Sequence, residues 1–356
     1  MRNIFRYPFA CFLLLINASV YGEYPARQKK ILLISGETQG NDSVASLRLA
    51  IQRQAETGLP TRIVLKGRFV IDQPLRLTAD NNYIEIEATK DNPAELVASN
   101  GVKQGVVVTG SVNARIAGLR IRGFAQDGIL VTNARGVIID DNVVQETFSK
   151  AWSQGAIHLT GTVTGAMIRR NLVTGADYAG ILVDTDATAD ISGVQITSNH
   201  VHETCRRVHD CGAIYVNDRG RRSRGILIAN NEVSDFGPVA VGGRGIYVDD
   251  WASHVTVLNN RIAGPGQFAF QIHGGNYNRI ERNSVDMTKI AIPLMYQAAI
   301  DGTRASMTNN IVSNNIFVRS RNGSPVVVPA YDRTGEGAVK FSRNQQCVGR
   351  DCSFIR

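Results

Sequence analysis

The spacing of apolar positions divides the chain into one helical stretch followed by a long series of strands. Residues 23–41 show no regular period and are expected to form a leader. Behind them, four apolar residues recur at spacings of three and four positions, after a residue that can cap a helix. The apolar residues are Val44, Leu47, Ile51 and Ala55, and the cap is Asp42 or Ser43. Residues 62–71 and 83–88 then alternate as strands, so an amphipathic helix precedes a β region.

A six-residue pattern, apolar-x-x-Asn-x-apolar, then recurs along the chain at intervals of 23 to 32 residues. Its asparagines are Asn142, Asn171, Asn199, Asn231, Asn260, Asn283 and Asn314. A fixed period in this range is typical of a solenoid. In a solenoid turn, an asparagine can bond the backbone and the asparagine one rung away. We therefore interpret these residues as a structural ladder and not as ligands.

A second strand repeats between the asparagine motifs, usually just after a glycine. These strands begin at Ile129, Ile157, Ile181, Ile214, Ile246 and Ile272. Two short strands per period, with no room for helices, favour a β-helix over helical or leucine-rich repeats. The predicted fold is all-β: a parallel β-helix over residues 42–320 with a short N-terminal capping helix, followed by a C-terminal cap or tail over 321–356.

Alternation along the second strand predicts two columns of side chains that point outwards. The first column is Leu130, His158, Leu182, Tyr215, Tyr247 and Gln271, and the second is Thr132, Thr160, Asp184, Asn217, Asp249 and His273. Residues able to do chemistry therefore gather on the four rungs from Asp184 to His273. At about 4.8 Å per rung, the backbones of Asp184 and Asp249 are expected roughly 10 Å apart.

Further acids precede or follow these strands, and each can either take part in chemistry or cap a turn. Asp210 sits four residues before Ile214, and Asp250 follows its strand directly. We interpret Asp177 and Asp218 as turn caps and retain Asp210 and Asp249 as catalytic candidates. Crowded carboxylates raise at least one pKa, which makes a carboxyl usable as an acid near neutral pH.

The chain resembles the right-handed parallel β-helix proteins of the pectate-lyase-like superfamily over roughly residues 42–320. The stretches Asp-Cys-Gly-Ala-Ile-Tyr at 210–215, Gly-Ile-Tyr-Val-Asp-Asp at 245–250 and Gln-Ile-His-Gly-Gly at 271–275 are similar to the active-site series of bacterial β-helical glycoside hydrolases. The resemblance implies Asp210 and Asp249 as the catalytic acids, with His273 binding sugar beside them. We add His273 and Asp184 to the catalytic candidates, because titratable clusters mark sites.

The same rungs supply candidate substrate-binding residues. Tyr215 and Tyr247 either form a cross-strand packing pair or offer a platform for a sugar ring. Guanidinium groups beside carboxylates suit an acidic ligand. The full set of candidates is Tyr215, Tyr247, Asn217, Gln271, Arg207, Arg219, Arg244, His209 and Asp250.

The N-terminus and the cysteines indicate export. Residues 1–22 combine two arginines with a short apolar run, the pattern of a cleavable signal peptide, so we expect a periplasmic or secreted protein with no stable membrane insertion. Close spacing suggests disulfides Cys205–Cys211 and Cys347–Cys352. A zinc site of His200, His202, Cys205 and Cys211 is the alternative. The net charge of +8, or +6 without Arg2 and Arg6, needs no nucleic-acid partner, and we expect a monomer.

Three functions remain open at this point. The first is a glycoside hydrolase on a polysaccharide, which needs no cofactor. The second is a polysaccharide lyase or uronate C5-epimerase, in which an arginine neutralises the sugar carboxylate, His273 or Tyr247 moves the proton, and Asp184 and Asp249 hold Ca²⁺. The third is a glycan-binding solenoid without activity, disfavoured because clustered carboxylates repel one another and anionic glycans.

Overall fold

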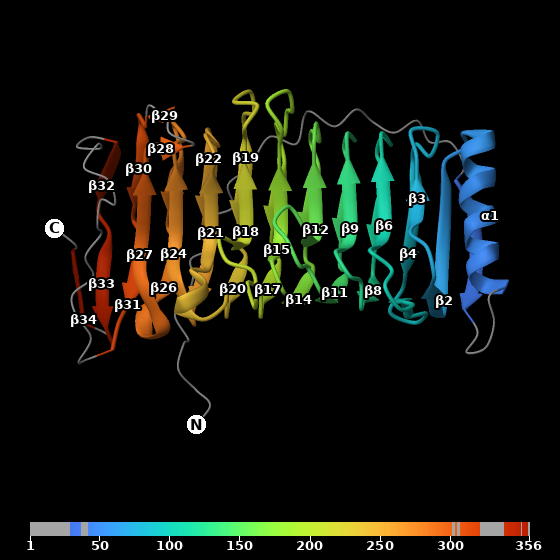
Figure 1. Ribbon diagram of the computed structural model, residues 1–356, viewed down its shortest axis with the longest axis horizontal. Coiled ribbons are helices and arrows are strands. Elements are labelled where there is room, and N and C mark those ends of the chain that lie inside the picture. Colours follow the sequence, from blue (N-terminus) through green and yellow to red (C-terminus); the bar gives the residue numbers. More distant parts are fainter. Residues whose placement is uncertain are drawn as a thin grey trace.

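In the computed structural model the chain forms one solenoid, with strands running across its long axis (Figure 1). The structure describes residues 29–36, 42–300, 303–304, 307–320, 338–349 and 351–354, and the predicted signal peptide lies outside them. The helices in these residues are α1 (Asp42–Thr57) and the single-turn 3-10 helices η1 (Val239–Val241) and η2 (Met287–Lys289). None of them is long and apolar enough to cross a membrane. The predicted all-β fold is confirmed.

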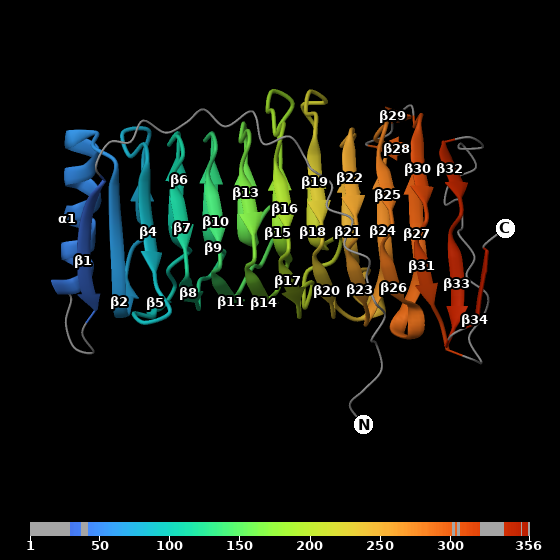
Figure 2. The ribbon, with the colours of Figure 1, turned by 180° about the vertical axis from the view of Figure 1, so that it is seen from behind.

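The strands form three parallel ladders, which give the solenoid its three faces. The first ladder contains β4 (Ile84–Ala88), β7 (Arg115–Ala117), β10 (Ile138–Asp140), β13 (Met167–Arg169), β16 (Gln195–Thr197), β19 (Ile226–Ala229), β22 (Val255–Leu258), β25 (Arg279–Glu281), β30 (Asn310–Ser313) and β32 (Val339–Ser342). The second contains β5 (Ala94–Ala98), β8 (Leu119–Arg122), β11 (Val143–Thr147), β14 (Leu172–Ala176), β17 (His200–His202), β20 (Glu232–Ser234), β23 (Arg261–Ala263), β26 (Ser284–Asp286), β31 (Ile316–Val318) and β33 (Gln345–Val348). The third contains β3 (Leu75–Leu77), β6 (Gln104–Thr109), β9 (Asp127–Thr132), β12 (Gly155–Thr160), β15 (Ala179–Asp184), β18 (Gly212–Asn217), β21 (Arg244–Asp249), β24 (Gly266–His273) and β27 (Ile290–Gln297). The third ladder faces the viewer in Figure 1. Figure 2 shows the molecule from the opposite side, where the first ladder can be followed.

Different elements close the two ends of the solenoid. At the N-terminal end β2 (Thr61–Ile71) pairs with both β4 and β5, and β1 (Lys30–Gly36) pairs with β2 in parallel. The helix α1 covers this end and buries Val44, Leu47 and Ile51. At the other end β34 (Asp351–Phe354) pairs antiparallel with β33, and β28 (Ala299–Ile300) and β29 (Thr303–Arg304) form a small hairpin. Strand β1 thus lies in the predicted leader, and β32 to β34 lie in the predicted cap or tail.

Inward-pointing residues of the three ladders build one continuous apolar core. On the third ladder Ile157, Ile181 and Ile214 stand in register on successive rungs, and each is fully buried. Burying an isoleucine side chain stabilises a fold by about 1.5–3 kcal/mol, and the repeat contributes such residues at every rung. The core therefore fixes which side chains of each strand must point outwards.

The asparagine ladder is confirmed, with one change of register. Each Nδ2 atom donates to the Oδ1 atom of the next asparagine at 2.9–3.0 Å. The members are Asn142, Asn171, Asn199, Asn231, Asn260, Asn283, Asn315 and Asn344. The prediction of Asn314 was wrong because the same pattern also fits one residue later, where Val312 pairs with Ile280. That register buries Phe317 and leaves Ile316 40% exposed.

The last predicted strand start is also shifted. Ile246 pairs with Phe270, not with Ile272, which pairs with Val248. An aromatic residue therefore takes the inward place that an isoleucine fills on the preceding rungs. The outward columns predicted around Gln271 and His273 are the ones observed.

Candidate active site

Four polar side chains stand in one outward column of the third ladder. Asn217 pairs in register with Asp249, His273 follows on the next rung, and Asp184 precedes on the rung before. The neighbouring column holds Leu182, Tyr215, Tyr247 and Gln271. The alternation predicted from the sequence thus brings these residues to one face, in the C-terminal half of the third ladder.

Asp249 is the centre of a hydrogen-bond network on this face. Its side chain is buried, and each of its oxygens has a partner from a neighbouring rung. The Tyr215 hydroxyl donates to Oδ2, and Nδ1 of His273 lies 2.6 Å from Oδ1. A carboxyl held from two sides keeps one orientation, which is what a catalytic group requires.

Asp250 lies beside Asp249 and shares its histidine. Its Oδ1 atom is 4.0 Å from Nδ1 of His273, and its Oδ2 atom lies 2.7 Å from Nε and 2.5 Å from Nη2 of Arg219. Burial and the charge of Asp249 raise the pKa of Asp250, against the opposing charge of Arg219. The backbone is unusual here, with φ values of 38° at Asp250 and 63° at Trp251. Two successive left-handed residues other than glycine mark a site where surrounding structure holds a strained turn.

The two tyrosines stack on each other and are buried. The ring centroids of Tyr215 and Tyr247 are 4.6 Å apart at 24°, and their side chains pack in a small apolar cluster outside the main core. The faces of their rings therefore do not form the open sugar platform considered from the sequence. Their hydroxyls point towards acids instead: burial raises both pKa values well above normal, and the charge of Asp249 adds to the shift. Both hydroxyls remain protonated near neutral pH.

The loop that carries Asp210 is part of the same cluster. The predicted disulfide Cys205–Cys211 forms, and both cysteines are buried against the tyrosines. Asp210 adopts a left-handed backbone with φ of 56°, and its carbonyl oxygen accepts a hydrogen bond of 2.9 Å from the Tyr178 hydroxyl. Its carboxylate is half exposed and lies 3.1 Å from Nη1 of Arg244.

Arg244 connects Asp210 to the aromatic cluster. Its guanidinium stands 4.5 Å from the ring centroid of Tyr247, and its Nε atom donates to Oε1 of Gln271 at 2.6 Å. Only 11% of its side chain is exposed. A buried, stacked and hydrogen-bonded arginine is a fixed positive charge at the edge of the site.

The charges of Asp210 and Asp249 both raise the pKa values of Tyr178 and Tyr247. The pKa of Tyr247 is raised by burial first and then by the charge of Asp249, with Asp210 adding a smaller contribution. The pKa of Tyr178 is raised by burial and then by Asp210 and Asp249 in turn. Contacts also connect the two carboxylates: Arg244 pairs with Asp210 and stacks on Tyr247, and Tyr247 stacks on Tyr215, which donates to Asp249.

Asp184 belongs to a separate group, which differs from its predicted pairing with Asp249. The Nε2 atom of His158 is 3.1 Å from Oδ1 of Asp184, and its Nδ1 atom is 3.1 Å from Oδ1 of Asp127. Burial lowers the pKa of His158, but the bonds to both acids outweigh it and raise the pKa to about 9. Burial raises the pKa of Asp184, but His158, with smaller contributions from Thr160 and Ser153, lowers it below its ordinary value. Asp184 is thus the charged partner of an imidazolium.

Two predicted substrate-binding amides have structural partners. Oδ1 of Asn217 accepts a 2.8 Å bond from the Thr185 amide, and Oε1 of Gln271 is occupied by Arg244. Both side chains are buried. They support the site from within the ladder, because their acceptor atoms are already used by the fold.

Two exposed members of the predicted set, Arg207 and His209, lie on the disulfide-clamped loop. Nε of Arg207 is 3.5 Å from the buried carboxylate of Asp177, and 68% of the Arg207 side chain is exposed. His209 is exposed, and its ring centroid lies 6.0 Å from that of Trp152. Trp152 sits in the loop before β12, so the two loops meet above the entry to the third ladder.

Metal-type ligands come together once in the part of the chain that the structure describes. One ligand atom from each of Asp249, Asp250 and His273 lies within 4.8 Å of the others. Arg219 and the Tyr215 hydroxyl already occupy carboxylate oxygens there, so a cation would have to displace them. Asp184 is not in this group, which disfavours the predicted Ca²⁺ pair. The zinc alternative is excluded because Cys205 and Cys211 form a disulfide.

Several site residues were not singled out from the sequence. His158 stood in the predicted outward column, but its partner Asp127 is the first residue of β9, two positions before the predicted strand start at Ile129 and outside both columns. Tyr178 and Trp152 are in loops, where alternation gives no direction for a side chain. The sequence signal for these two residues is their position: each lies in the loop just before a strand of the third ladder.

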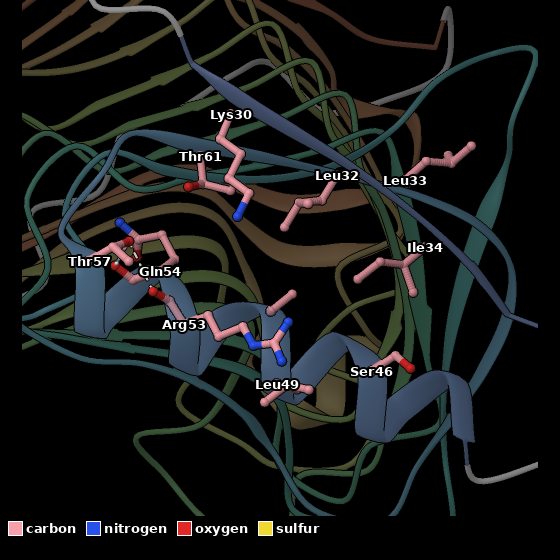
Figure 3. A pocket seen from close by; sticks show the side chains of 11 residues that line it. Lys30, Leu32, Leu33, Ile34, Ser46, Leu49, Arg53, Gln54, Thr57 and Thr61 are labelled. Carbon is pink, nitrogen blue, oxygen red and sulfur yellow. Dashed lines mark hydrogen bonds between the residues drawn. The ribbon is translucent and has the colours of Figure 1, made fainter.

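A cavity of about 260 Å³ lies elsewhere, between β1 and α1 (Figure 3). Lys30 and Arg53 line it together with leucine and isoleucine side chains, and its lining includes no carboxylate. It therefore lacks the acids that define the site on the third ladder.

Comparison with known families agrees with this architecture. A family model described as "Right handed beta helix region" matches residues 76–199, 104–285 and 179–356. The chain belongs to this right-handed β-helix family, which confirms the predicted fold and its handedness. No curated protein sequence matches the chain.

Solved structures with the same fold include carbohydrate-active enzymes. The catalytic domain of a GH87 α-1,3-glucanase, crystallised with tetrasaccharides, is 12% identical with a TM-score of 0.56, covering 90% of this chain and 70% of that one. A GH136 lacto-N-biosidase from Eubacterium ramulus is 13% identical, with a TM-score of 0.54 and coverages of 90% and 68%. The A-module of a mannuronan C-5 epimerase from Azotobacter vinelandii is 14% identical, with a TM-score of 0.50 and coverages of 85% and 91%. At such identities the likeness shows the fold alone.

Proposed function

We propose that the protein is a glycoside hydrolase that cleaves a polysaccharide on the outward face of the third ladder. The observation that carries the proposal is a chain of contacts between two carboxylates, Asp210 and Asp249. Arg244 pairs with Asp210 and stacks on Tyr247, and Tyr247 stacks on Tyr215, whose hydroxyl donates to Asp249. Glycoside hydrolysis needs two carboxyl groups that flank one glycosidic bond. The related folds of a glucanase and a lacto-N-biosidase are compatible with this chemistry.

The environments of the acids suggest a division of roles. Asp250 lies beside Asp249 in a buried position, and burial and the charge of Asp249 raise the pKa of Asp250, so Asp250 keeps its proton to a higher pH than an exposed carboxyl does. Asp210 is half exposed and water reaches it. In the proposed step, the Asp249–Asp250 pair donates a proton to the glycosidic oxygen. Asp210 takes a proton from water as the water oxygen bonds to the anomeric carbon and the leaving sugar departs.

The remaining side chains of the network would support this step. His273 and Tyr215 orient Asp249, and Arg244 orients Asp210. Arg219 holds Asp250 in place. None of these contacts requires a cofactor, and the proposed hydrolysis uses only the side chains of this chain and water.

One observation favours a second candidate, a polysaccharide lyase or uronate C5-epimerase. A carboxylate that contacts Nδ1 of a histidine, as Asp249 contacts that of His273, makes the imidazole a better base. A tyrosine kept protonated, such as Tyr215, can return a proton to the substrate. The arginines of the site would then neutralise the sugar carboxylate. A glycan-binding solenoid without activity is the third outcome of the test.

The experiment separates these reactions by their products. The purified protein is incubated with acidic and neutral bacterial and plant polysaccharides, while new reducing ends and ultraviolet absorbance of unsaturated sugars are followed together. Hydrolysis gives reducing ends without absorbance, whereas absorbance growth would identify a lyase and reject the proposal. An epimerase would change the uronate composition seen by proton NMR without cleavage, and tight binding with no product would leave a binding protein.

The assignment of Asp210 as the base has its own test. In Asp210→Ala, the missing carboxylate leaves space for a small anion, so added azide is expected to restore turnover and to appear in the product as a glycosyl azide. Asp186→Ala, at an exposed acid near the same face, is the control. Full activity of Asp210→Ala without azide would show that Asp210 is not the base.

We also propose that the protein works outside the cytoplasm. Two disulfides, Cys205–Cys211 and Cys347–Cys352, support export to the periplasm or beyond, because such bonds persist in oxidising surroundings. A polysaccharide substrate would be met there. Fractionation of cells that produce the chain would locate it.

A further inference from the structure

The loops beside the site carry an exposed aromatic side chain that the proposed chemistry does not use. Trp152 is 60% exposed, in the loop between β11 and β12. It is one of only two tryptophans in the sequence. The other, Trp251, follows Asp249 by two positions, is partly buried, and has its ring covered at 4.0 Å by the Arg221 guanidinium. Trp152 is thus the tryptophan with an open surface.

The position of Trp152 is tied to the site by its neighbours. The next residue, Ser153, lies close enough to Asp184 to help lower the pKa of its carboxyl. On the other side, the ring of Trp152 meets His209 edge to face, with centroids 6.0 Å apart at 90°. His209 directly precedes Asp210 and lies inside the Cys205–Cys211 loop. An exposed indole is therefore fixed between the Asp184 group and the loop that delivers a proposed catalytic acid.

The charges around this aromatic pair are mostly positive. Lys150 precedes Trp152 by two residues and is exposed, and Arg206 and Arg207 lie in the partner loop. The two arginines share one buried carboxylate, that of Asp177, at 3.8 Å and 3.5 Å. Asp210, the other acid of this loop, is paired with Arg244, so the cations still outnumber the anions in the two loops. Such a surface attracts an anionic ligand.

We infer that Trp152 and His209, with Lys150 and Arg207, form a subsite that binds an acidic sugar residue of the substrate. The indole would stack on the apolar face of the sugar ring, and the cations would pair with its carboxylate or sulfate group. The inference rests on the proposed function for its substrate class, a polysaccharide, and adds that the chain is anionic. It assigns Trp152 to binding and not to the chemical step.

The test measures glycan binding by the full-length protein. Isothermal titration calorimetry and tryptophan fluorescence are recorded with oligogalacturonate, alginate and hyaluronan oligosaccharides, and with neutral xylo- and malto-oligosaccharides. We expect at least one acidic series to bind, with a blue shift of the emission and an affinity that falls as NaCl is raised. Trp152→Ala should weaken that binding by about tenfold or more, as expected for loss of an aromatic anchor.

Matched variants control for general effects of the substitutions. Phe354 on β34 is 63% exposed, so Phe354→Ala removes a similar aromatic surface far from the site and should leave binding unchanged. Lys150→Gln and Arg207→Gln should each weaken binding and flatten its salt dependence, whereas Lys340→Gln, at an exposed lysine on β32, should not. Thermal melts show whether each variant keeps its fold.

The outcomes distinguish the subsite from the proposed reaction. Undiminished binding by Trp152→Ala, preference for neutral glycans, or no glycan binding at all would overturn the subsite. If the wild-type protein cleaves glycans while Trp152→Ala retains the wild-type KM, the hydrolase stands and the subsite fails. If no product forms but acidic glycans bind through Trp152, the subsite stands and the hydrolase fails.

Discussion

Asp249 and His273 stand on consecutive rungs with 2.6 Å between the Oδ1 atom of one and the Nδ1 atom of the other. Because Tyr215 donates to the remaining oxygen of Asp249, one carboxyl joins the three rungs β18, β21 and β24. The repeat of the solenoid supplies this arrangement directly: equal positions on successive strands lie at one rung's spacing.

Asp249→Asn keeps the shape of the side chain and removes its charge and its proton. We expect kcat to fall by about 10²- to 10⁴-fold, the usual contribution of a positioned acid or base. The thermal midpoint should change little, because asparagine still accepts a hydrogen bond from Tyr215. Kinetics and circular dichroism are compared with Asp186→Asn, at an exposed acid on a neighbouring turn. Unchanged kcat in Asp249→Asn would contradict the site assignment for any reaction.

The disulfide Cys205–Cys211 is expected to matter for activity as well as stability, because it closes the loop that holds Asp210. Replacing both cysteines by serine should lower the free energy of unfolding by about 2 kcal/mol, the entropic effect of a short loop. It should also lower kcat/KM, because Asp210 loses its fixed position against Arg244. Denaturant unfolding and steady-state kinetics measure the two effects separately.

The second disulfide provides the matched comparison. Cys347–Cys352 closes a loop of similar length at the C-terminal end of the solenoid, away from the third ladder's acids. Its removal is expected to cost similar stability and to leave kcat/KM at the wild-type value. Equal losses of activity in both double variants would show that Cys205–Cys211 acts only through global stability.

The fold could be predicted because every rung repeats the same physical requirement. An inward isoleucine and a buried asparagine return at each turn. So many repeats of one pattern cannot arise by chance. The register was less certain where two adjacent residues both fit, as at Asn314 and Asn315. Burial decides between them, since Phe317 must be covered and Ile316 need not be, and burial is a property of the whole fold.

The site could be predicted as far as strands determine it. Alternation placed Asp249 and His273 in one column correctly, but it gave no information on the loops that fold over that column. The clamped loop buries Tyr215 and Tyr247, which the strand pattern alone presents as exposed. The contact of His158 with Asp127 was missed because Asp127 lies outside both predicted columns.

The corrected register of the asparagine ladder makes a direct prediction. Asn199 donates to the Ile168 carbonyl and to Asn231, and its Oδ1 atom accepts from the amide and side chain of Asn171. Asn199→Ala leaves these buried partners unsatisfied and should lower the free energy of unfolding by about 2–4 kcal/mol. Asn314→Gly, one residue outside the ladder at a left-handed position (φ 57°) that glycine adopts without strain, should cost under about 1 kcal/mol. Equal costs in urea unfolding would contradict the register.

The bridge of Asp127, His158 and Asp184 predicts how stability depends on pH. The pKa of His158 is about 9 in the fold, above its ordinary value of 6.5. A group whose pKa is raised by folding stabilises the fold fully below its unfolded pKa and loses that contribution as pH rises through its folded pKa. The stability from His158 is therefore present below about pH 6.5 and disappears between about pH 6.5 and 9.

His158→Gln removes this titration while keeping a side chain that can bond both acids. The free energy of unfolding of the wild-type protein should decline by about 2–3 kcal/mol more than that of the variant between pH 6 and pH 9.5, at about 1.4 kcal/mol per pKa unit. Urea unfolding at closely spaced pH values measures the difference, and NMR of the imidazole gives the pKa itself. Parallel pH curves for the two proteins would show that His158 is not held as an imidazolium. In that case the Asp184 carboxylate would lack its charged partner and would return to the set of candidate catalytic acids.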